Sequence, residues 1–265
     1  MKIFGNKSDI VASSWSGMVK QMKMMFLQQE YILLYCRPVK NNGLENLHSS
    51  GSNKMKFGVQ NLFKRFGRRI IFQNIAFELE KGDSIAFIGN NGSGKSTLAK
   101  ICAGVLSPTS GTVELSIDEK KIPSEKYFQH IGFVAPYLQL YDEFSPMENL
   151  KFFAKIRGIL SSNEECEELL QRVNLFHRKD DLVRTFSSGM KQRMKFAFAL
   201  LHNPLLLILD EPTSNLDAEG GAMVFQIMEE QKKKGILILA TNVQAEQEHC
   251  EKVISISSNH SQKNR

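Results

Sequence analysis

The sequence lacks any stretch that is long and apolar enough to cross a membrane as a helix. Such a span needs about 18 or more consecutive apolar residues, and the nearest candidate, residues 24–36, is interrupted by Gln28, Gln29 and Glu30. The N-terminus also lacks the charged start, apolar core and small-residue cleavage site of a secretory signal. We therefore expect a cytoplasmic protein, or one held at the cytoplasmic face of the cell membrane by partners.

Cysteine is scarce, and so is any concentration of positive charge in the body of the chain. The four cysteines are scattered without a CxxC pair, which argues against a zinc site and a disulfide scaffold. Of the formal net charge of +6, residues 1–54 contribute seven Lys/Arg and three Asp/Glu, or +4, which leaves 27 minus 25, or +2, for residues 55–265. No basic stripe with interleaved aromatics is present, so we expect no nucleic acid as a partner.

Residues 1–54 differ in character from the rest of the chain. They end in the Asn-, Ser- and Gly-rich run NNGLENLHSSGSNK, and a second methionine, Met55, opens an alternating strand pattern. We predict a poorly ordered N-terminal extension at 1–54 and a short tail at 258–265. A membrane-surface or partner-binding helix within residues 19–35 is the alternative.

Residues 55–257 alternate short apolar strands with helical stretches, which predicts an α/β domain. Residues 84–88, 205–209 and 236–240 are apolar on both faces, as strands in the middle of a parallel sheet are. An antiparallel β flap is expected near residues 56–80. The mostly helical stretch at about 136–203 lies between strand-rich blocks and predicts an inserted helical subdomain.

A glycine-rich motif of the form GxxxxGK[ST] follows the apolar strand at 84–88 and opens a helix, which is the context that a phosphate-binding loop requires. Its backbone N–H groups and the helix N-terminus favour phosphate oxygens. Lys95 is expected to reach the β- and γ-phosphates of ATP, and Ser96 to ligate Mg²⁺. The predicted nucleotide-binding residues here are Gly89, Asn90, Asn91, Gly92, Ser93, Gly94, Lys95, Ser96 and Thr97.

An acidic pair ends the second apolar strand. Asp210 and Glu211 directly follow residues 205–209 and should emerge at the carboxyl edge of the sheet, where α/β folds bind ligands. Asp210 is expected to assist Mg²⁺ binding, and Glu211 to act as the general base on the attacking water. Alone, such a pair would be read as a solvated turn; beside the phosphate-binding loop it predicts hydrolysis.

The order of these pieces resembles the ATP-binding-cassette (ABC) transporter ATPases over about residues 56–257. The distinguishing segment is FSSGM at residues 186–190, whose Ser187 and Gly189 match the family's cap on the γ-phosphate of the opposite subunit. Phe186, Ser188 and Met190 depart from the family's leucine, glycine and glutamine. The resemblance implies a P-loop NTPase of ABC type, with a mainly parallel sheet, an antiparallel β flap and an inserted helical subdomain.

Further positions carry the resemblance or depart from it. Asp217 matches a dimer-contact loop, and Phe66 matches the aromatic that stacks on adenine. Pro136 stands where the family has a metal-sensing glutamine. The nearest glutamine, Gln139, is three residues late, and with Ser96 and Asp210 it completes the metal-site residues that the resemblance implies. Asn242 replaces a histidine that contacts the γ-phosphate, and with Lys95 and Glu211 it completes the catalytic residues that the resemblance implies.

The resemblance implies an ATP-binding subunit that hydrolyses Mg-ATP in a head-to-tail dimer, as a homodimer or a heterodimer, and drives transport by separate transmembrane permease subunits. The motif at 186–190 is closest to exporter-type subunits, including haem-exporter ATPases. The alternatives are a soluble ABC protein acting on ribosomes or DNA, and a slow regulatory ATP-binding module.

Overall fold

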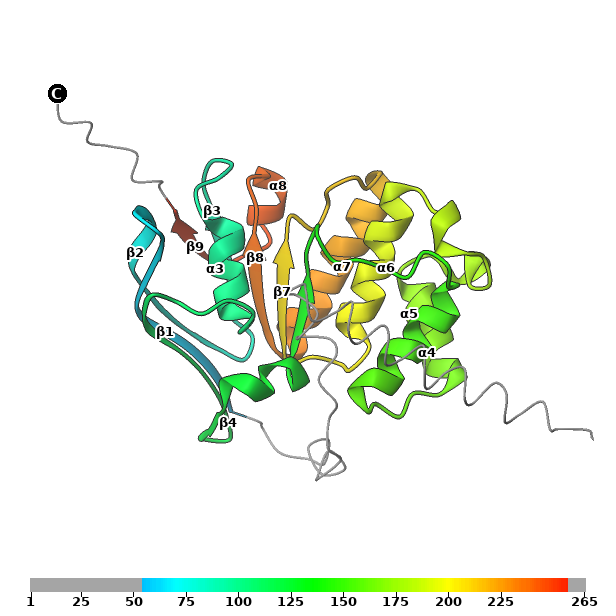
Figure 1. Cartoon of the computed structure of the whole chain (residues 1–265), viewed down its shortest axis with the longest axis horizontal. Coiled ribbons are helices and arrows are strands. Elements are labelled where there is room, and N and C mark those ends of the chain that lie inside the picture. Colours follow the sequence, from blue (N-terminus) through cyan, green and yellow to red (C-terminus); the bar gives the residue numbers. More distant parts are fainter. Residues whose placement is uncertain (1–53, 257–265) are drawn as a thin grey trace, which may run out of the picture.

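The computed structural model describes residues 54–256. The predicted extension, apart from Lys54, and the predicted tail at 258–265 lie outside the described residues. Within residues 54–256, no helix combines the length and the hydropathy that a membrane crossing requires. Figure 1 shows two sheets side by side, with a group of helices at the end of the molecule remote from β1 and β2.

A parallel sheet of five strands forms the centre of the molecule. Its strands are short and apolar on both faces, and nearly every residue of the middle three is buried because helices cover the sheet. The predicted parallel sheet is confirmed, with the order β6 (Ile131–Val134), β7 (Leu206–Asp210), β8 (Ile236–Ala240), β3 (Ser84–Ile88) and β9 (Lys252–Ser255).

The strand ends of this sheet lie level with one another. Ala240 of β8 pairs with Asp210 of β7 on one side and with Phe87 of β3 on the other. The residues that follow these three strands therefore emerge together at one edge, as expected for the carboxyl ends of parallel strands.

The second sheet is antiparallel and larger than the flap predicted near residues 56–80. The long strands β1 and β2 form a hairpin, and β4 and β5 extend the sheet from the other edge of β1. The antiparallel sheet thus includes residues 110–122, which are far along the chain from the hairpin of β1 and β2. Its order is β2 (Arg69–Glu80), β1 (Met55–Phe66), β4 (Ser110–Ile117) and β5 (Lys120–Ile122).

The helices divide between the sheet and the remote group. The helix α3 (Lys95–Cys102) packs on β7 and β8, and α7 (Ala218–Lys234) packs on β8. The helices α4 (Pro146–Arg157) and α5 (Asn163–Arg172) pack on each other and on α6 (Ser188–Leu200), which also contacts β6. Short elements complete the described chain: the 3₁₀ turns η2 (Ser124–Gln129), η3 (Phe176–Arg178) and η4 (Val183–Thr185), and the helix α8 (Gln244–Gln247).

Local sequence fixes where the remote helices begin. Ser162 and Glu165 form a capping box at the start of α5, and Ser145 and Glu148 form another at the start of α4. Phe153 of α4 packs against Phe198 of α6, with ring centroids 4.3 Å apart, and this contact holds the two helices together. The division into a core and a helical subdomain at about 136–203 stays a prediction.

Candidate functional site

The loop between β3 and α3 has the backbone of a tight anion-binding turn. Gly89, Gly92 and Gly94 all have positive φ, at 144°, 77° and 112°. A Cβ on Gly89 would lie 2.4 Å from the carbonyl oxygen of Ile256, so only glycine fits there. The first turn of α3 contains no acidic residue, and its free N–H groups are left for an anion.

Lys95 lies inside this loop rather than in solvent. Its ammonium group donates to the carbonyl oxygens of Gly89 at 2.7 Å and Asn90 at 3.1 Å, and its side chain is buried. Both acceptors are neutral, so the charge of the lysine is not compensated by them and is available to an anion. The hydroxyl of Ser93 is also buried, without a hydrogen-bond partner among the described residues. The loop therefore holds a cation and a free polar atom, as a phosphate site needs.

Ser96 and Asp210 meet at the base of the loop. The Ser96 hydroxyl donates to Asp210 Oδ1 at 2.9 Å, which brings together two residues that are 114 positions apart. Burial raises the pKa of Asp210 to about 6, while the Ser96 hydrogen bond opposes the rise. The other carboxylate oxygen, Oδ2, is buried and has no partner among the described residues.

These oxygens fit Mg²⁺ as a ligand set that substrate would complete. Magnesium is commonly bound through one or two carboxylates together with substrate phosphates, and a hydroxyl and a carboxylate with a free oxygen are hard ligands of that kind. In residues 54–256, no group of three or more His, Cys, Asp or Glu could hold a metal ion. A metal at Ser96 and Asp210 would thus depend on bound nucleotide.

Glu211 and Asn242 follow neighbouring strands and face the same edge. Glu211 has a φ of 49°, and its N–H donates to Ala240 O at 2.9 Å, so it leaves the end of β7 in a sharp turn. Asn242 Nδ2 donates to Asn91 Oδ1 in the phosphate loop at 3.0 Å. The side chain of Asn242 thus contacts the phosphate loop, and its contact with a γ-phosphate stays a prediction.

Phe66 projects from the hairpin of the antiparallel sheet. Its ring is 50% exposed, and the Lys64 ammonium lies 4.7 Å from the ring centroid. Arg69, just beyond the turn of the hairpin, donates to Gly92 O at 3.5 Å and ties the turn to the phosphate loop. The ring of Phe66 is thus available beside the loop. Thr97, another of the predicted nucleotide-binding residues, lies in the first turn of α3 and is partly buried.

A second group of predicted residues gathers at the N-terminal end of α6. Ser187 is the N-cap of α6 and accepts from Met190 N at 3.2 Å. A Cβ on Gly189 would lie 2.8 Å from Asn215 O, so the helix start closely approaches the loop that follows β7. Both residues line a pocket of about 850 Å³ together with Asp217.

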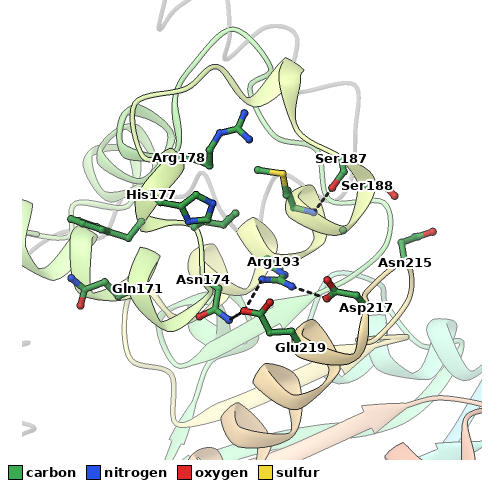
Figure 2. Close-up of a pocket in the computed structure, with 14 residues that line it drawn as sticks. Gln171, Asn174, His177, Arg178, Ser187, Ser188, Arg193, Asn215, Asp217 and Glu219 are labelled. Carbon is green, nitrogen blue, oxygen red and sulfur yellow. Dashed lines mark hydrogen bonds and ion pairs between the residues drawn. The ribbon is translucent and has the colours of Figure 1, made fainter.

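Charged side chains form ion pairs with one another along this pocket. Figure 2 shows Arg193 between Asp217, at 2.7 Å, and Glu219, at 3.8 Å. Asp217 caps α7 through Gly220 N, and this bond, with Arg193, holds the pKa of Asp217 below its usual range. The carboxylate of Asp217 is largely exposed, so it can also contact a group on another molecule.

The two groups do not form a single site within this chain. The residues around the pocket include no member of the loop at 89–97, nor Asp210, Glu211 or Asn242. Each group of residues therefore lacks the members of the other.

Pro136 and Gln139 lie beside a different pocket, of about 570 Å³, which includes Ser188 and Lys195 but neither Ser96 nor Asp210. The ammonium of Lys195 donates to Pro136 O at 2.6 Å, and burial lowers the pKa of Lys195. A lysine from α6 thus holds the segment where a glutamine was expected. Metal ligation by Gln139 stays a prediction.

Several residues near the site were not found from the sequence. Gln192 donates to Pro212 O at 3.1 Å, and Glu246 accepts from Thr213 N at 3.2 Å and from its hydroxyl. Both side chains are buried and hold the loop that follows Glu211. Gln192 had the weak signal of following the 186–190 motif, whereas Glu246 sits in a polar run with no motif.

Comparisons with known proteins identify the family of this chain. A profile of the family described as "ABC transporter" matches residues 72–214, more than half of the 265-residue chain. The lantibiotic transport ATP-binding protein SrtF of Streptococcus pyogenes is 38% identical over 192 residues, which cover 72% of this chain and 82% of SrtF. An uncharacterized ABC transporter ATP-binding protein of Bacillus subtilis, YybJ, is 33% identical over 198 residues, covering 75% and 88%.

Solved structures have the same fold. The structure of an ATP-binding subunit of an ABC transporter matches with a TM-score of 0.67 at 29% identity, covering 76% of this chain and 86% of that one. A dimeric ATP-binding cassette in a post-hydrolysis state, bound to ADP and Pi, also gives a TM-score of 0.67, at 24% identity, covering 76% and 94%. The second likeness concerns the fold alone.

Proposed function

The chain belongs to the ATP-binding subunits of ABC transporters, an ATPase family, and from this premise we propose how its own residues bind and hydrolyse Mg-ATP. The observation that carries the proposal is the pair of contacts that gathers the loop, Asp210 and Asn242 at one sheet edge. The domain division proposed is an ATPase domain at 55–257 with a helical part at about 136–203.

The loop residues would bind and orient the phosphates. Lys95 would exchange its two carbonyl acceptors for β- and γ-phosphate oxygens, which are stronger, charged acceptors. Phe66 would stack its exposed ring on adenine. Mg²⁺, held by Ser96 and Asp210 with the phosphates, would supply charge neutralisation at the β- and γ-oxygens.

Glu211 and Asn242 would act on the attacking water. Glu211, at the end of β7, would accept its proton as the general base. Asn242, which reaches the loop through Asn91, would donate a neutral hydrogen bond to the γ-phosphate. Lys95 and the N-terminus of α3 would stabilise the charge of the transferred group.

We further propose that two chains face head to tail, as a homodimer or a heterodimer. The separation of the loop group from the pocket at Ser187, Gly189 and Asp217 supports this arrangement, because each face offers what the other lacks. Ser187 and Gly189 would then cap the γ-phosphate of the opposite chain, and Asp217 would contact the opposite loop.

As a transporter subunit, the chain would work on the cytoplasmic face of the cell membrane against separate membrane-spanning permease subunits. We propose export as the direction, which the exporter-like motif at 186–190 favours and which agrees with a relative named for lantibiotic transport. The haem-exporter likeness of the motif stays a prediction.

The test combines catalysis with partner capture. Lys95→Ala should abolish Mg-ATP hydrolysis and weaken nucleotide binding, because it removes the cation between the two phosphates; Lys126→Ala, on a surface turn away from the loop, is the control. The tagged wild-type chain should also co-purify with a multi-span membrane protein from detergent-treated membranes. Hydrolysis by Lys95→Ala at the wild-type rate would contradict the site, and recovery with ribosomes or DNA instead of a membrane protein would contradict transport.

A further inference from the structure

A buried carboxylate outside the nucleotide site contacts the loop that carries the proposed base. Glu246 belongs to α8, four residues after Asn242, and its side chain is 1% exposed. One of its oxygens, Oε1, accepts from both the N–H and the hydroxyl of Thr213. Thr213 lies two residues after Glu211 in the segment that connects β7 to α7.

This contact joins two segments that follow different strands. Residues 211–217 carry Glu211 and Asp217, while residues 241–247 carry Asn242 and Glu246. The backbone hydrogen bond from Glu211 N–H to Ala240 O lies at the start of both segments, because Ala240 directly precedes the second one. The carboxylate of Glu246 adds a side-chain connection two residues farther along.

The loop is held from both sides at adjacent residues. Gln192, from α6, donates to Pro212 O, and Glu246, from α8, binds Thr213. Glu211 itself has a φ of 49°, a backbone conformation that a residue with a side chain keeps only when its surroundings hold it. The direction of the Glu211 carboxylate therefore depends on how firmly residues 212 and 213 are fixed.

Burying the carboxylate of Glu246 costs free energy that an apolar side chain in the same place would not cost. Removing an acid from water is unfavourable unless hydrogen bonds compensate it, and Oε2 of Glu246 is buried without a partner among the described residues. A purely structural position would be filled more favourably by an apolar side chain. The carboxylate of Glu246 is suited to accepting hydrogen bonds from both donors of Thr213.

We infer that Glu246 is a positioning residue for hydrolysis: through Thr213 it sets the placement of Glu211 relative to Asn242. The inference rests on the proposed roles of Glu211 and Asn242. It assigns Glu246 no contact with nucleotide, so its loss should slow the chemical step and leave ATP binding in place.

The experiment measures kcat, KM, nucleotide affinity and melting temperature in the full chain. Glu246→Ala should lower kcat by about tenfold to a hundredfold, the scale of a misplaced catalytic group, with KM changed by about twofold at most. Glu246→Gln keeps an oxygen acceptor for Thr213 and should recover most of kcat. The matched control is Glu248→Ala, on the exposed side of the same segment, which should hydrolyse ATP at the wild-type rate.

A double-mutant cycle separates this role from general stability. Thr213→Val removes one donor and keeps the backbone N–H, so it should lower kcat less than Glu246→Ala does. The combined variant should be no slower than Glu246→Ala, because both changes break the same connection. If Glu246→Ala does not fold, Thr213→Val and Glu246→Gln still decide the matter through kcat at unchanged nucleotide affinity.

The outcomes that overturn the inference are distinct from those that overturn the site. A wild-type kcat in Glu246→Ala, additive losses in the cycle, or equal losses of kcat and nucleotide affinity would reject a positioning role. In each case wild-type hydrolysis that depends on Lys95 would leave the proposed function standing. A wild-type chain that hydrolyses no ATP would reject the proposed function itself.

Discussion

Asn242 shows what a single side chain can and cannot supply at the proposed site. Its amide donates to Asn91 in the phosphate loop at 3.0 Å, and we propose that it donates to the γ-phosphate when nucleotide is bound. An asparagine donates a neutral hydrogen bond, whereas a protonated histidine would donate a charged one. In the proposed role, Asn242 would therefore supply a contact without a charge.

We expect Asn242→His to raise the turnover of the isolated protein. Charge-assisted hydrogen bonds are roughly twice as strong as neutral ones, so on the order of 1–2 kcal/mol of transition-state stabilisation would be added, or about a tenfold rate. ATP affinity should stay the same, because the gain arises in the transition state. Single-turnover hydrolysis, with and without a membrane partner, is the measurement.

A histidine variant that is no faster than the parent would mean that Asn242 already positions the water, or that its contact with Asn91 matters more than charge. A gain seen only without the membrane partner would show that the partner supplies the missing contact. Asn242→Ala is the control that removes both the donor and the contact.

Single residues were predictable where a motif and a strand end coincided. The contact between Ser96 and Asp210 follows from a phosphate loop and an acidic strand end in one parallel sheet. Glu246 and Lys195 were not predictable, because each is a charged residue that the fold buries against a backbone or hydroxyl group far away in sequence. Such burial depends on tertiary packing, which local hydropathy does not report.

At the scale of elements, α6 contacts both the remote helices α4 and α5 and the parallel sheet. Its N-cap, Ser187, lies beside one pocket, and Lys195 donates to Pro136 O. His202, two residues after the end of α6, contacts β6. The His202 ring donates from Nε2 to Ile131 O, because a carbonyl can only accept. Its other nitrogen, Nδ1, is buried without a partner among the described residues.

His202 should make folding stability fall in acid. Burial, with further contributions from Arg157, His130 and Lys234, holds the pKa of His202 well below 6.5. The folded state therefore binds fewer protons than the unfolded state below pH 6.5, and stability declines as pH falls from 6.5 towards the folded pKa. The slope within that window is about 1.4 kcal/mol per pH unit.

The measurement is the free energy of unfolding in urea between pH 5 and pH 8, for the wild type and for His202→Gln. Glutamine can still donate to Ile131 O and does not titrate, so its curve should lack this contribution. His130, whose pKa burial also lowers, is retained in both proteins. Parallel curves for the two proteins would show that His202 does not titrate differently in the two states.

Elements with strong local patterns were predicted better than their pairing. The apolar runs of β3, β7 and β8 indicated a parallel sheet because they are buried on both faces. The pattern of residues 112–115 predicts a short strand, which lies within β4, but the mostly exposed residues 120–122 of β5 carry no apolar pattern. The place of β4 beside β1 is a long-range pairing, with Met55 opposite Ile117, which no local pattern encodes.

At the scale of the whole molecule, the proposed dimer should be visible when hydrolysis is stopped. Glu211→Gln keeps the loop and its contacts but cannot accept the proton from water, so ATP should stay bound between two chains. Because ligand binding favours the assembled state, the apparent mass should rise roughly twofold in Mg-ATP. Size-exclusion chromatography with light scattering measures this, with Mg-ADP as the control.

A monomer of Glu211→Gln that retains ATP would contradict the head-to-tail arrangement while leaving the nucleotide site intact. Adding Ser187→Ala and Gly189→Ala to Glu211→Gln should abolish the mass shift, since these residues would cap the opposite γ-phosphate. If the shift persisted, the two chains would have to meet through another surface.

The separation of the loop group from the pocket at Ser187, Gly189 and Asp217 also has a kinetic meaning. In the proposed dimer a lone chain holds only half of each reaction site, so it is idle however much ATP is present. At concentrations well below the dimer dissociation constant, the number of working pairs grows with the square of the chain concentration. The hydrolysis rate would then be second order in protein when dilute and first order once pairing is complete, so that unassembled chains consume almost no nucleotide.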